Sequence, residues 1–271
     1  MTVPLPRRWE LAGPDGETPG PGIPGYLKPG MEPFDPLSLA ELTQPVVCRG
    51  EGRKYTRFHC VGVYGGISTG YAVGCNLRCV FCWVGLSRDF PHRHGRLCSA
   101  EETARNLVDK AKRRGLEKIR ISGGEPTLCR RHLLKVLELT RPSGMRFILE
   151  TNGVLLGADE SYVRELGRFS HIHLRLSLKA GNGAGWEART GAKKESFELP
   201  YRAIRFLVGS GVRFHVAAMT DPALMPGAER QELLDRLEDA GYRDWVEEEA
   251  CYAYDLTLLR LRESGFKASK S

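Results

Sequence analysis

The chain has 271 residues, of which 41% are hydrophobic and 27% are charged, and its formal net charge at pH 7 is +7. This length and composition are typical of one globular domain with a large core, and they exclude a chain that is disordered throughout. No apolar run approaches the roughly 20 residues that a membrane-spanning helix needs, and the N-terminus lacks the pattern of a signal peptide. We therefore expect a cytoplasmic protein with no membrane partner.

The N-terminal part of the chain differs in composition from the rest. Nine of the sixteen prolines fall within the first 36 positions, interleaved with glycine. Such a segment buries too little apolar surface to fold by itself, so we predict an extended or disordered leader over residues 1–37. Residues 38–64, with short strands at 46–48 and 59–64, are expected to pack on a catalytic core over 65–255. A C-terminal helix and tail follow over 256–271.

Three cysteines follow a short strand predicted at 70–73, with the spacing C-x3-C-x2-C at Cys75, Cys79 and Cys82. Three thiolates on so short a loop can bind three irons of a [4Fe–4S] cluster and leave the fourth iron without a protein ligand. Close cysteines also bind structural zinc, but zinc needs a fourth ligand. The downstream candidates, His92, His94 and Cys98, do not match a common finger spacing.

Helix and strand patterns alternate from the cysteine loop to about residue 246. Ser99 and Glu102 form a capping box at the start of a helix that ends at Gly115. Apolar periodicity predicts four further helices and five further strands, the helices near 133–137, 162–166, 201–208 and 233–237, the strands at 118–122, 146–149, 173–179, 212–219 and 242–246. Six parallel strands with right-handed crossovers predict a sheet that curls toward a barrel, in which chemistry occurs at the carboxyl ends of the strands.

The strand predicted at 118–122 ends in the sequence GGEP at Gly123, Gly124, Glu125 and Pro126. Two glycines let the backbone approach a bound molecule closely, and a carboxylate can accept a hydrogen bond from an ammonium group. Alone, the same residues are also typical of an ordinary turn before a helix.

Together, the cysteine triad and GGEP resemble the signature of the radical S-adenosylmethionine (radical SAM) superfamily, C-x3-C-x-aromatic-C followed by a GGE-type motif. Phe81 occupies the aromatic position, and the resemblance covers residues 65–255. It implies an α/β fold, a partial (β/α)6 barrel with parallel strands, here with the Pro/Gly-rich extension. It also implies a [4Fe–4S] cluster on the three cysteines and S-adenosylmethionine at the open iron. The implied reaction is reductive cleavage of S-adenosylmethionine to a 5′-deoxyadenosyl radical that abstracts hydrogen from a substrate, with an external one-electron donor such as ferredoxin or flavodoxin.

The resemblance extends to contacts with the cofactor. It implies that Phe81 packs against the cluster or the adenine, although an ordinary core position fits this aromatic residue nearly as well. It also places Glu125, with the backbone of Gly123 and Gly124, at the ammonium group of the cofactor.

Polar residues at the ends of two later strands complete the expected site. Thr151 and Asn152 match positions of contacts to the methionyl or ribose groups, although an Asn-Gly pair is also an ordinary turn. Ser177 and Lys179 match positions of ribose and carboxylate contacts in relatives with similar LSLK-like strands. With period two they share a face with Arg175, which fits a polar barrel lumen.

Other polar residues are interpreted more plainly. We expect His215 to be a satisfied core histidine and His92 and His94 to belong to a polar loop. The acidic run at 247–249 is expected to be a solvated surface rather than the far wall of the site. Five cysteines lie outside the triad: Cys48, Cys60, Cys98, Cys129 and Cys251. No C-x2-C pair occurs among them, so we expect free thiols rather than ligands of a second cluster. Cys48 and Cys60 are the best candidates for an exception.

The sequence does not identify the substrate. The basic net charge allows an anionic partner such as RNA, and Trp83 after the triad resembles the CxFCW motif of tRNA-wybutosine-type enzymes. The size and LxLK strand resemble glycyl-radical-enzyme activases, whose substrate is a protein, but their cysteine triad usually lies nearer the N-terminus. A non-enzymatic alternative is a binding module with structural zinc or an inert iron–sulfur cluster, against which GGEP and the βα repeat argue.

Overall fold

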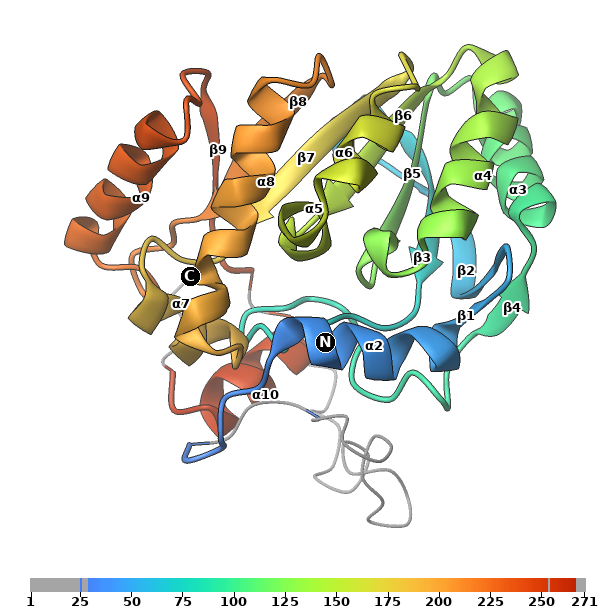
Figure 1. Cartoon of the computed structure of the whole chain (residues 1–271). Coiled ribbons are helices and arrows are strands. Elements are labelled where there is room, and N and C mark those ends of the chain that lie inside the picture. The colour runs from blue at the N-terminus through green and yellow to red at the C-terminus, as the bar shows by residue number, and fades with distance from the viewer. Residues whose placement is uncertain (1–24, 26–28, 253, 267–271) are drawn as a thin grey trace.

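The computed structural model describes residue 25, residues 29–252 and residues 254–266 of the chain. Most of the leader predicted over 1–37 lies outside the described residues, as does the end of the C-terminal tail, 267–271. Within the described part, nine strands form one sheet, and helices cover its outer face (Figure 1).

Six parallel strands confirm the predicted partial barrel. They stand side by side in the order β3-β5-β6-β7-β8-β9, and the path ends at β9, so that the barrel is open over the described residues. Their bounds are β3 Ile67–Ala72, β5 Lys118–Gly123, β6 Arg146–Thr151, β7 Ile172–Leu178, β8 Phe214–Met219 and β9 Val246–Glu249. Because all six run in the same direction, the residues that follow them meet at one edge of the sheet.

The alternation along β7 shows how these strands separate core from lumen. Leu174 and Leu176 are fully buried and belong to the main hydrophobic core. Arg175 and Ser177 alternate with them and line a cavity on the other face. Successive side chains point to opposite faces of a strand, so one seven-residue strand supplies both a packed outer layer and a polar inner wall.

The helices between the parallel strands pack on the outside of the barrel (Figure 1). Ser99 caps the first of them, because its hydroxyl accepts from the backbone N–H of Glu102. This is one half of the predicted capping box, and the Glu102 carboxylate pairs with Arg96. The bounds are α3 Ala100–Arg113, α4 Arg130–Thr140, α5 Val154–Ala158, α6 Glu160–Leu166, α7 Gly183–Thr190, α8 Glu198–Val208 and α9 Gly227–Asp239. None of the helices in the described part is long and apolar enough to cross a membrane.

Two helices lie across the carboxyl ends of the strands (Figure 1). The first, α2 Pro36–Val47, covers two of the three residues of the strand predicted at 46–48, which is a correction; only Cys48 begins a strand. It begins at a proline, which suits a first helical position, and Asp35 accepts from the N–H of Leu37. Pro45 lies inside it and hides the helical pattern from sequence reasoning. The second, α10 Asp255–Glu263, is the helix expected near the C-terminus.

An antiparallel extension continues the sheet beyond β3. It consists of β1 Cys48–Arg49, β2 Gly52–Val61 and β4 Arg96–Cys98. The strand predicted at 59–64 is only the last part of β2, which pairs with the other two and with β3. Short 3-10 turns complete the fold at η1 Val63–Gly65, η2 Pro126–Leu128, η3 Arg141–Ser143 and η4 Lys194–Phe197.

The last parallel strand lies further along the chain than predicted. The residues at 242–246 mostly form the turn before it, where the Tyr242 hydroxyl donates to the carbonyl of Trp245 at 2.7 Å. The strand itself is Val246 followed by three glutamates, which pair with Ala217, Ala218 and Met219 of β8. An acidic run has no apolar alternation, so periodicity could not identify this strand.

A disulfide joins Cys48 to Cys129, which corrects the expectation of free thiols at these positions. Their Cα atoms lie 5.7 Å apart, within the normal range for a bridge. The two cysteines meet because α2 packs against the segment between GGEP and α4, in a small apolar cluster with Val47 and Leu128. Cys60, Cys98 and Cys251 take part in no disulfide.

Candidate active site

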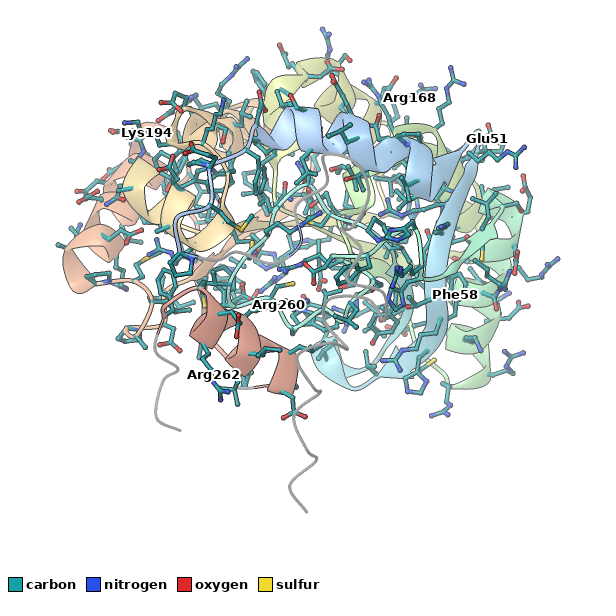
Figure 2. The ribbon with its side chains drawn as sticks, turned by 90° about the horizontal axis from the view of Figure 1, so that it is seen from below. Glu51, Phe58, Arg168, Lys194, Arg260 and Arg262 are labelled. Carbon is teal, nitrogen blue, oxygen red and sulfur yellow. A yellow bond between two sulfur atoms is a disulfide. The ribbon has the colours of Figure 1, made fainter. Side chains whose placement is uncertain are left out.

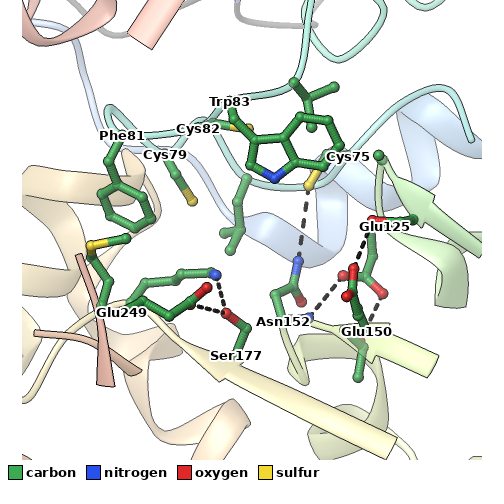
Figure 3. A pocket seen from close by; sticks show the side chains of 18 of the residues that line it. Cys75, Cys79, Phe81, Cys82, Trp83, Glu125, Glu150, Asn152, Ser177 and Glu249 are labelled. Carbon is green, nitrogen blue, oxygen red and sulfur yellow. Dashed lines mark hydrogen bonds between the residues drawn. The ribbon is translucent and has the colours of Figure 1, made fainter. Parts of the chain in front are cut away.

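One cavity opens at the carboxyl ends of the parallel strands (Figure 3). Every residue that the sequence singled out for metal or cofactor contact lines it: Cys75, Cys79, Phe81, Cys82, Gly123, Gly124, Glu125, Thr151, Asn152, Ser177 and Lys179. The neighbours that sequence reasoning did not assign to the site include Trp83, Glu150, Glu249, Tyr252 and Tyr254. His92 and His94 are not among the lining residues.

The cysteine loop follows β3 directly and is held by backbone hydrogen bonds from several directions. Gly74 begins it with a φ of 82°, a conformation that favours glycine. The N–H of Arg78 donates to Thr190 and that of Val80 to Arg189, so the loop rests on the end of α7. In Figure 3 the sulfurs of Cys75 and Cys79 point toward the enclosed space.

Among the described residues, no three His, Cys, Asp or Glu side chains are grouped as they would be around a single metal ion. In a [4Fe–4S] cluster each thiolate ligates a different iron. Burial raises the pKa of the Cys75 thiol to about 12, with Glu125 adding to the effect. Metal binding at this position therefore has to displace a proton.

Two glycines of GGEP let that segment dock on the cysteine loop. Gly123 has a φ of 92°. A Cβ on Gly124 would lie 2.0 Å from the carbonyl oxygen of Gly74, which is far inside contact distance. The N–H of Glu125 donates to the same carbonyl at 2.9 Å. Gly124 therefore allows a close approach between two segments of the chain rather than to a bound molecule. This contact places GGEP beside Cys75.

Glu125 is buried, and its carboxylate is the centre of a hydrogen-bond group. Its Oε1 accepts from the N–H and hydroxyl of Thr127, at 3.1 and 2.7 Å, and from the hydroxyl of Thr151 at 2.7 Å. Its Oε2 accepts from the N–H of Asn152 at 2.9 Å. Arg53, itself buried, donates to the carbonyl oxygen of Glu125 at 2.8 Å. The side chain is thus held rigidly, and Oε2 has the greater remaining capacity to accept.

Asn152 links the third strand end to the cysteine loop. Its Nδ2 donates to Asn76 Oδ1 at 2.9 Å and lies 4.0 Å from the sulfur of Cys75 (Figure 3). Its Oδ1 accepts from the N–H of Val154, as in an ordinary Asx turn. The residue therefore combines a turn role with a contact to the site.

The lumen wall beside the cavity is a charged network. Arg175 forms ion pairs with Glu247 and Glu249, each at 2.8 Å. Lys179 Nζ donates to Ser177 Oγ at 2.5 Å and lies 5.7 Å from the centre of the Phe81 ring. The expectation that the acidic run is a solvated surface is therefore wrong for Glu247 and Glu249, because Arg175 holds both carboxylates in the lumen.

His215 is satisfied, as expected. It hydrogen-bonds His173 at 2.7 Å and Glu247 at 3.0 Å, and it stacks on Trp245. These contacts fill both ring nitrogens.

Glu150 is a partly buried acid that sequence reasoning missed. It accepts from Arg120 at 2.5 Å, from the Ser122 hydroxyl at 2.6 Å and from the Tyr64 hydroxyl at 2.7 Å. Burial alone would raise its pKa, but Arg120 and these hydrogen bonds hold the pKa below its usual range. The available signal was its place directly before Thr151 at the end of a predicted strand.

Comparison with known proteins places this fold and cavity in a family. The model of the Radical SAM superfamily matches residues 71–246. The chain therefore belongs to the radical SAM superfamily, whose fold implies a [4Fe–4S] cluster and S-adenosylmethionine as cofactors. The residues fit these groups, because three thiols and a polar wall of donors and acceptors share one cavity. Enzymes of this family generally need an external electron donor.

Two curated relatives are GTP 3′,8-cyclases. The probable GTP 3′,8-cyclase of Methanococcus maripaludis (strain C6 / ATCC BAA-1332) is 39% identical over 105 residues, 38% of this chain and 33% of that protein. The GTP 3′,8-cyclase of Peptoclostridium acidaminophilum is 35% identical over 116 residues, 42% of this chain and 34% of that protein. The chain thus matches about a third of the length of each of these relatives.

Two solved structures show the same fold. Streptococcus suis SuiB bound to S-adenosylmethionine superposes with a TM-score of 0.51 at 19% identity, over 68% of this chain and 38% of that one. TYW1 with a lysine-pyruvate adduct bound gives a TM-score of 0.54 at 18% identity, over 74% and 68% of the two chains. At this identity the likeness concerns the fold alone.

Proposed function

We propose that this chain is a radical SAM enzyme in which Cys75, Cys79 and Cys82 ligate three irons of the cluster. The observation that carries the proposal is the convergence of three thiols from one loop, GGEP and two polar strand ends on a single cavity. When bound and reduced by one electron, the cluster and S-adenosylmethionine supply methionine and a 5′-deoxyadenosyl radical, which takes a hydrogen atom from the substrate.

The roles of the other residues follow from their hydrogen bonds. Glu125 Oε2, which has a single donor among the described contacts, is suited to accept from the ammonium group of the cofactor. Lys179 is suited to the cofactor carboxylate, because its ammonium group donates to a neutral hydroxyl and forms no ion pair within the described part of the chain, whereas Arg175 is neutralised by two carboxylates. This ammonium group also lies over the Phe81 ring, within the range of a cation–π interaction.

Anaerobic reconstitution tests the core of this proposal. We expect about four irons per chain and formation of 5′-deoxyadenosine from S-adenosylmethionine with dithionite. Cys79→Ser should lose the cluster and this product. Cys98→Ser is the matched control, because Cys98 is also a buried free thiol but does not line the cavity. Stable binding of one zinc per chain would overturn the proposal in favour of a binding module, and full activity of Cys79→Ser would show that Cys79 does not ligate the cluster.

The mouth of the cavity favours a substrate with a flat heterocyclic ring, as in a nucleotide or an RNA base. Trp83, Tyr252 and Tyr254 line the cavity and are 47%, 72% and 58% exposed, respectively. Tyr71 packs edge-on against Trp83, and Arg57 lies over the Tyr71 ring at 4.9 Å. Exposed rings beside a cation are typical of surfaces on which bases stack. The names of the curated relatives agree with a nucleotide substrate. A protein substrate, as for a glycyl-radical-enzyme activase, is the less favoured alternative.

Deuterium transfer distinguishes these substrates. Deuterated GTP, a deuterated tRNA pool and a deuterated peptide pool are each incubated with the reconstituted enzyme, and label in 5′-deoxyadenosine is measured. We expect label from one of the two nucleotide sources, reduced severalfold in Trp83→Ala. Val208→Ala, which removes an equally exposed side chain outside the cavity, should leave transfer unchanged. Label from the peptide pool alone would contradict the preference for a heterocycle.

A further inference from the structure

Three arginines hold the three candidate ligand residues by their backbone. Arg78 Nη1 donates to the carbonyl oxygen of Cys75 at 2.8 Å and Arg88 Nη1 to that of Cys79 at 2.7 Å. Arg260 Nη1 donates to the carbonyl oxygen of Cys82 at 2.6 Å. Each cysteine of the triad thus has its own guanidinium group.

These guanidinium groups are buried together behind the loop. Arg78, Arg88 and Arg260 are 0%, 2% and 4% exposed. Asp89, which is 1% exposed, joins two of them: its Oδ1 accepts from Arg88 at 2.6 and 2.9 Å, and its Oδ2 accepts from Arg260 at 2.6 Å. Burial alone would raise the pKa of Asp89, but Arg88 and Arg260 keep it below its usual range. The group therefore carries more positive than negative charge.

The third arginine comes from a distant part of the chain. Arg260 lies on α10, 178 residues after Cys82, and it also donates to the carbonyl of Val84 at 2.6 Å. Thr257 of the same helix donates to the carbonyl of Cys82 at 3.1 Å. Figure 2 shows Arg260 directed into the molecule and Arg262 at the surface. The helix thus fastens the last cysteine of the triad.

We propose that Arg78, Arg88 and Arg260, the last two of which are joined by Asp89, are positioning residues that fix the cysteine loop before the cluster binds and favour the reduced cluster electrostatically. The proposal rests on the function proposed above. A loop whose carbonyls are already bonded loses little conformational freedom when it binds metal. A cluster gains one negative charge on reduction, so a nearby excess of positive charge stabilises the reduced form more than the oxidised form.

Charge variants test the electrostatic part through the midpoint potential, measured by spectroscopically monitored titration of reconstituted protein. Arg260→Gln should favour the oxidised cluster by about threefold or more, which lowers the midpoint potential by ~30 mV for one electron. Asp89→Asn removes a negative charge and should raise the midpoint potential. Arg260→Lys keeps the charge and should restore most of the potential. Arg262→Gln removes an exposed charge from the same helix and should change nothing.

The rate of alkylation of Cys82 in the cluster-free protein tests the positioning part. Arg260→Gln and Arg260→Lys should both react at least about threefold faster than the wild type, because neither side chain reproduces the fork that spans two carbonyls and a carboxylate. If Arg260→Gln does not fold, Arg260→Lys decides this point alone. An unchanged alkylation rate, together with midpoint potentials that shift in the same direction in Arg260→Gln and Asp89→Asn, would overturn the inference. A wild type that binds no cluster would instead overturn the proposed function.

Discussion

The hydroxyl of Thr151 donates to Glu125 Oε1 at 2.7 Å and so ties the end of β6 to GGEP. Both residues are buried, and the bond fixes which face of the carboxylate is turned toward the cavity. We predict that Thr151→Val weakens the binding of S-adenosylmethionine about fivefold, because Glu125 loses one hydrogen bond of about 1 kcal/mol and keeps three other donors. The variant also removes the acceptor of the Gly153 N–H, a bond within the turn that does not involve Glu125. Calorimetric titration of the reconstituted protein measures this change.

The iron content of Thr151→Val should stay at the wild-type value, since the bond does not hold a cysteine. Thr56→Val is the control, because the Thr56 hydroxyl also donates one hydrogen bond but at an exposed site on β2. Equal affinities of Thr151→Val and the wild type would show that Glu125 does not need this bond.

Replacing Lys179 should weaken cofactor binding more than replacing Thr151. The ammonium group of Lys179 is the cation of the cavity that is not already paired with a carboxylate among the described contacts. Lys179→Met should weaken binding of S-adenosylmethionine by about tenfold or more, as expected for a lost hydrogen bond between charged groups. The iron content should not change, and decarboxylated S-adenosylmethionine should bind equally to both proteins. If Lys179→Met still bound S-adenosylmethionine more tightly than decarboxylated S-adenosylmethionine by the wild-type factor, the cofactor carboxylate would not bind at Lys179.

The disulfide between Cys48 and Cys129 leads to a prediction on stability. It closes a loop with a sequence separation of 81 residues and fastens α2 to the segment after GGEP. Breaking such a bridge typically lowers the free energy of unfolding by 2–4 kcal/mol. Urea unfolding of Cys129→Ser should therefore show a lower midpoint, and dithiothreitol should lower the midpoint of the wild type but not of the variant. Cys60→Ser, a change at a free thiol, should behave as the wild type does.

The sequence was informative where local patterns carry the structure. In β5 and β7 apolar and polar residues alternate, and in β6 three consecutive apolar residues form a short run, so all three strands are visible without their neighbours. Residues that follow such strands must share one edge of the sheet, so the cavity could be predicted from strand ends alone.

The parts that were missed depend on partners far away in the sequence. The strand β9 contains three glutamates, two of which are drawn into the lumen by Arg175 on β7. Arg260 looks like any helical surface cation until α10 is placed against Cys82. The disulfide likewise depends on the packing of α2, whose helical pattern Pro45 obscures. No local pattern contains this information.

His132 makes the stability of the fold dependent on pH. The side chain is fully buried, and its ring nitrogens contact the Tyr55 hydroxyl at 2.8 Å and the carbonyl of Glu51 at 2.6 Å. Burial, with Arg53 nearby, lowers the pKa of this imidazole from 6.5 to about 4. Between these two values the unfolded chain binds more protons than the folded one, so the free energy of unfolding falls as the pH is lowered from 6.5 toward 4.

Thermal unfolding across this pH range measures the effect. The melting temperature of the wild type should fall as the pH drops from 6.5 to about 4, whereas that of His132→Gln, although lower at pH 7, should depend less on pH in the same window. His59→Gln changes an exposed histidine on β2 and should retain the wild-type slope. The same slope in His132→Gln and the wild type would assign the acid sensitivity to other groups, because a side chain that cannot take up a proton contributes nothing to proton-linked unfolding.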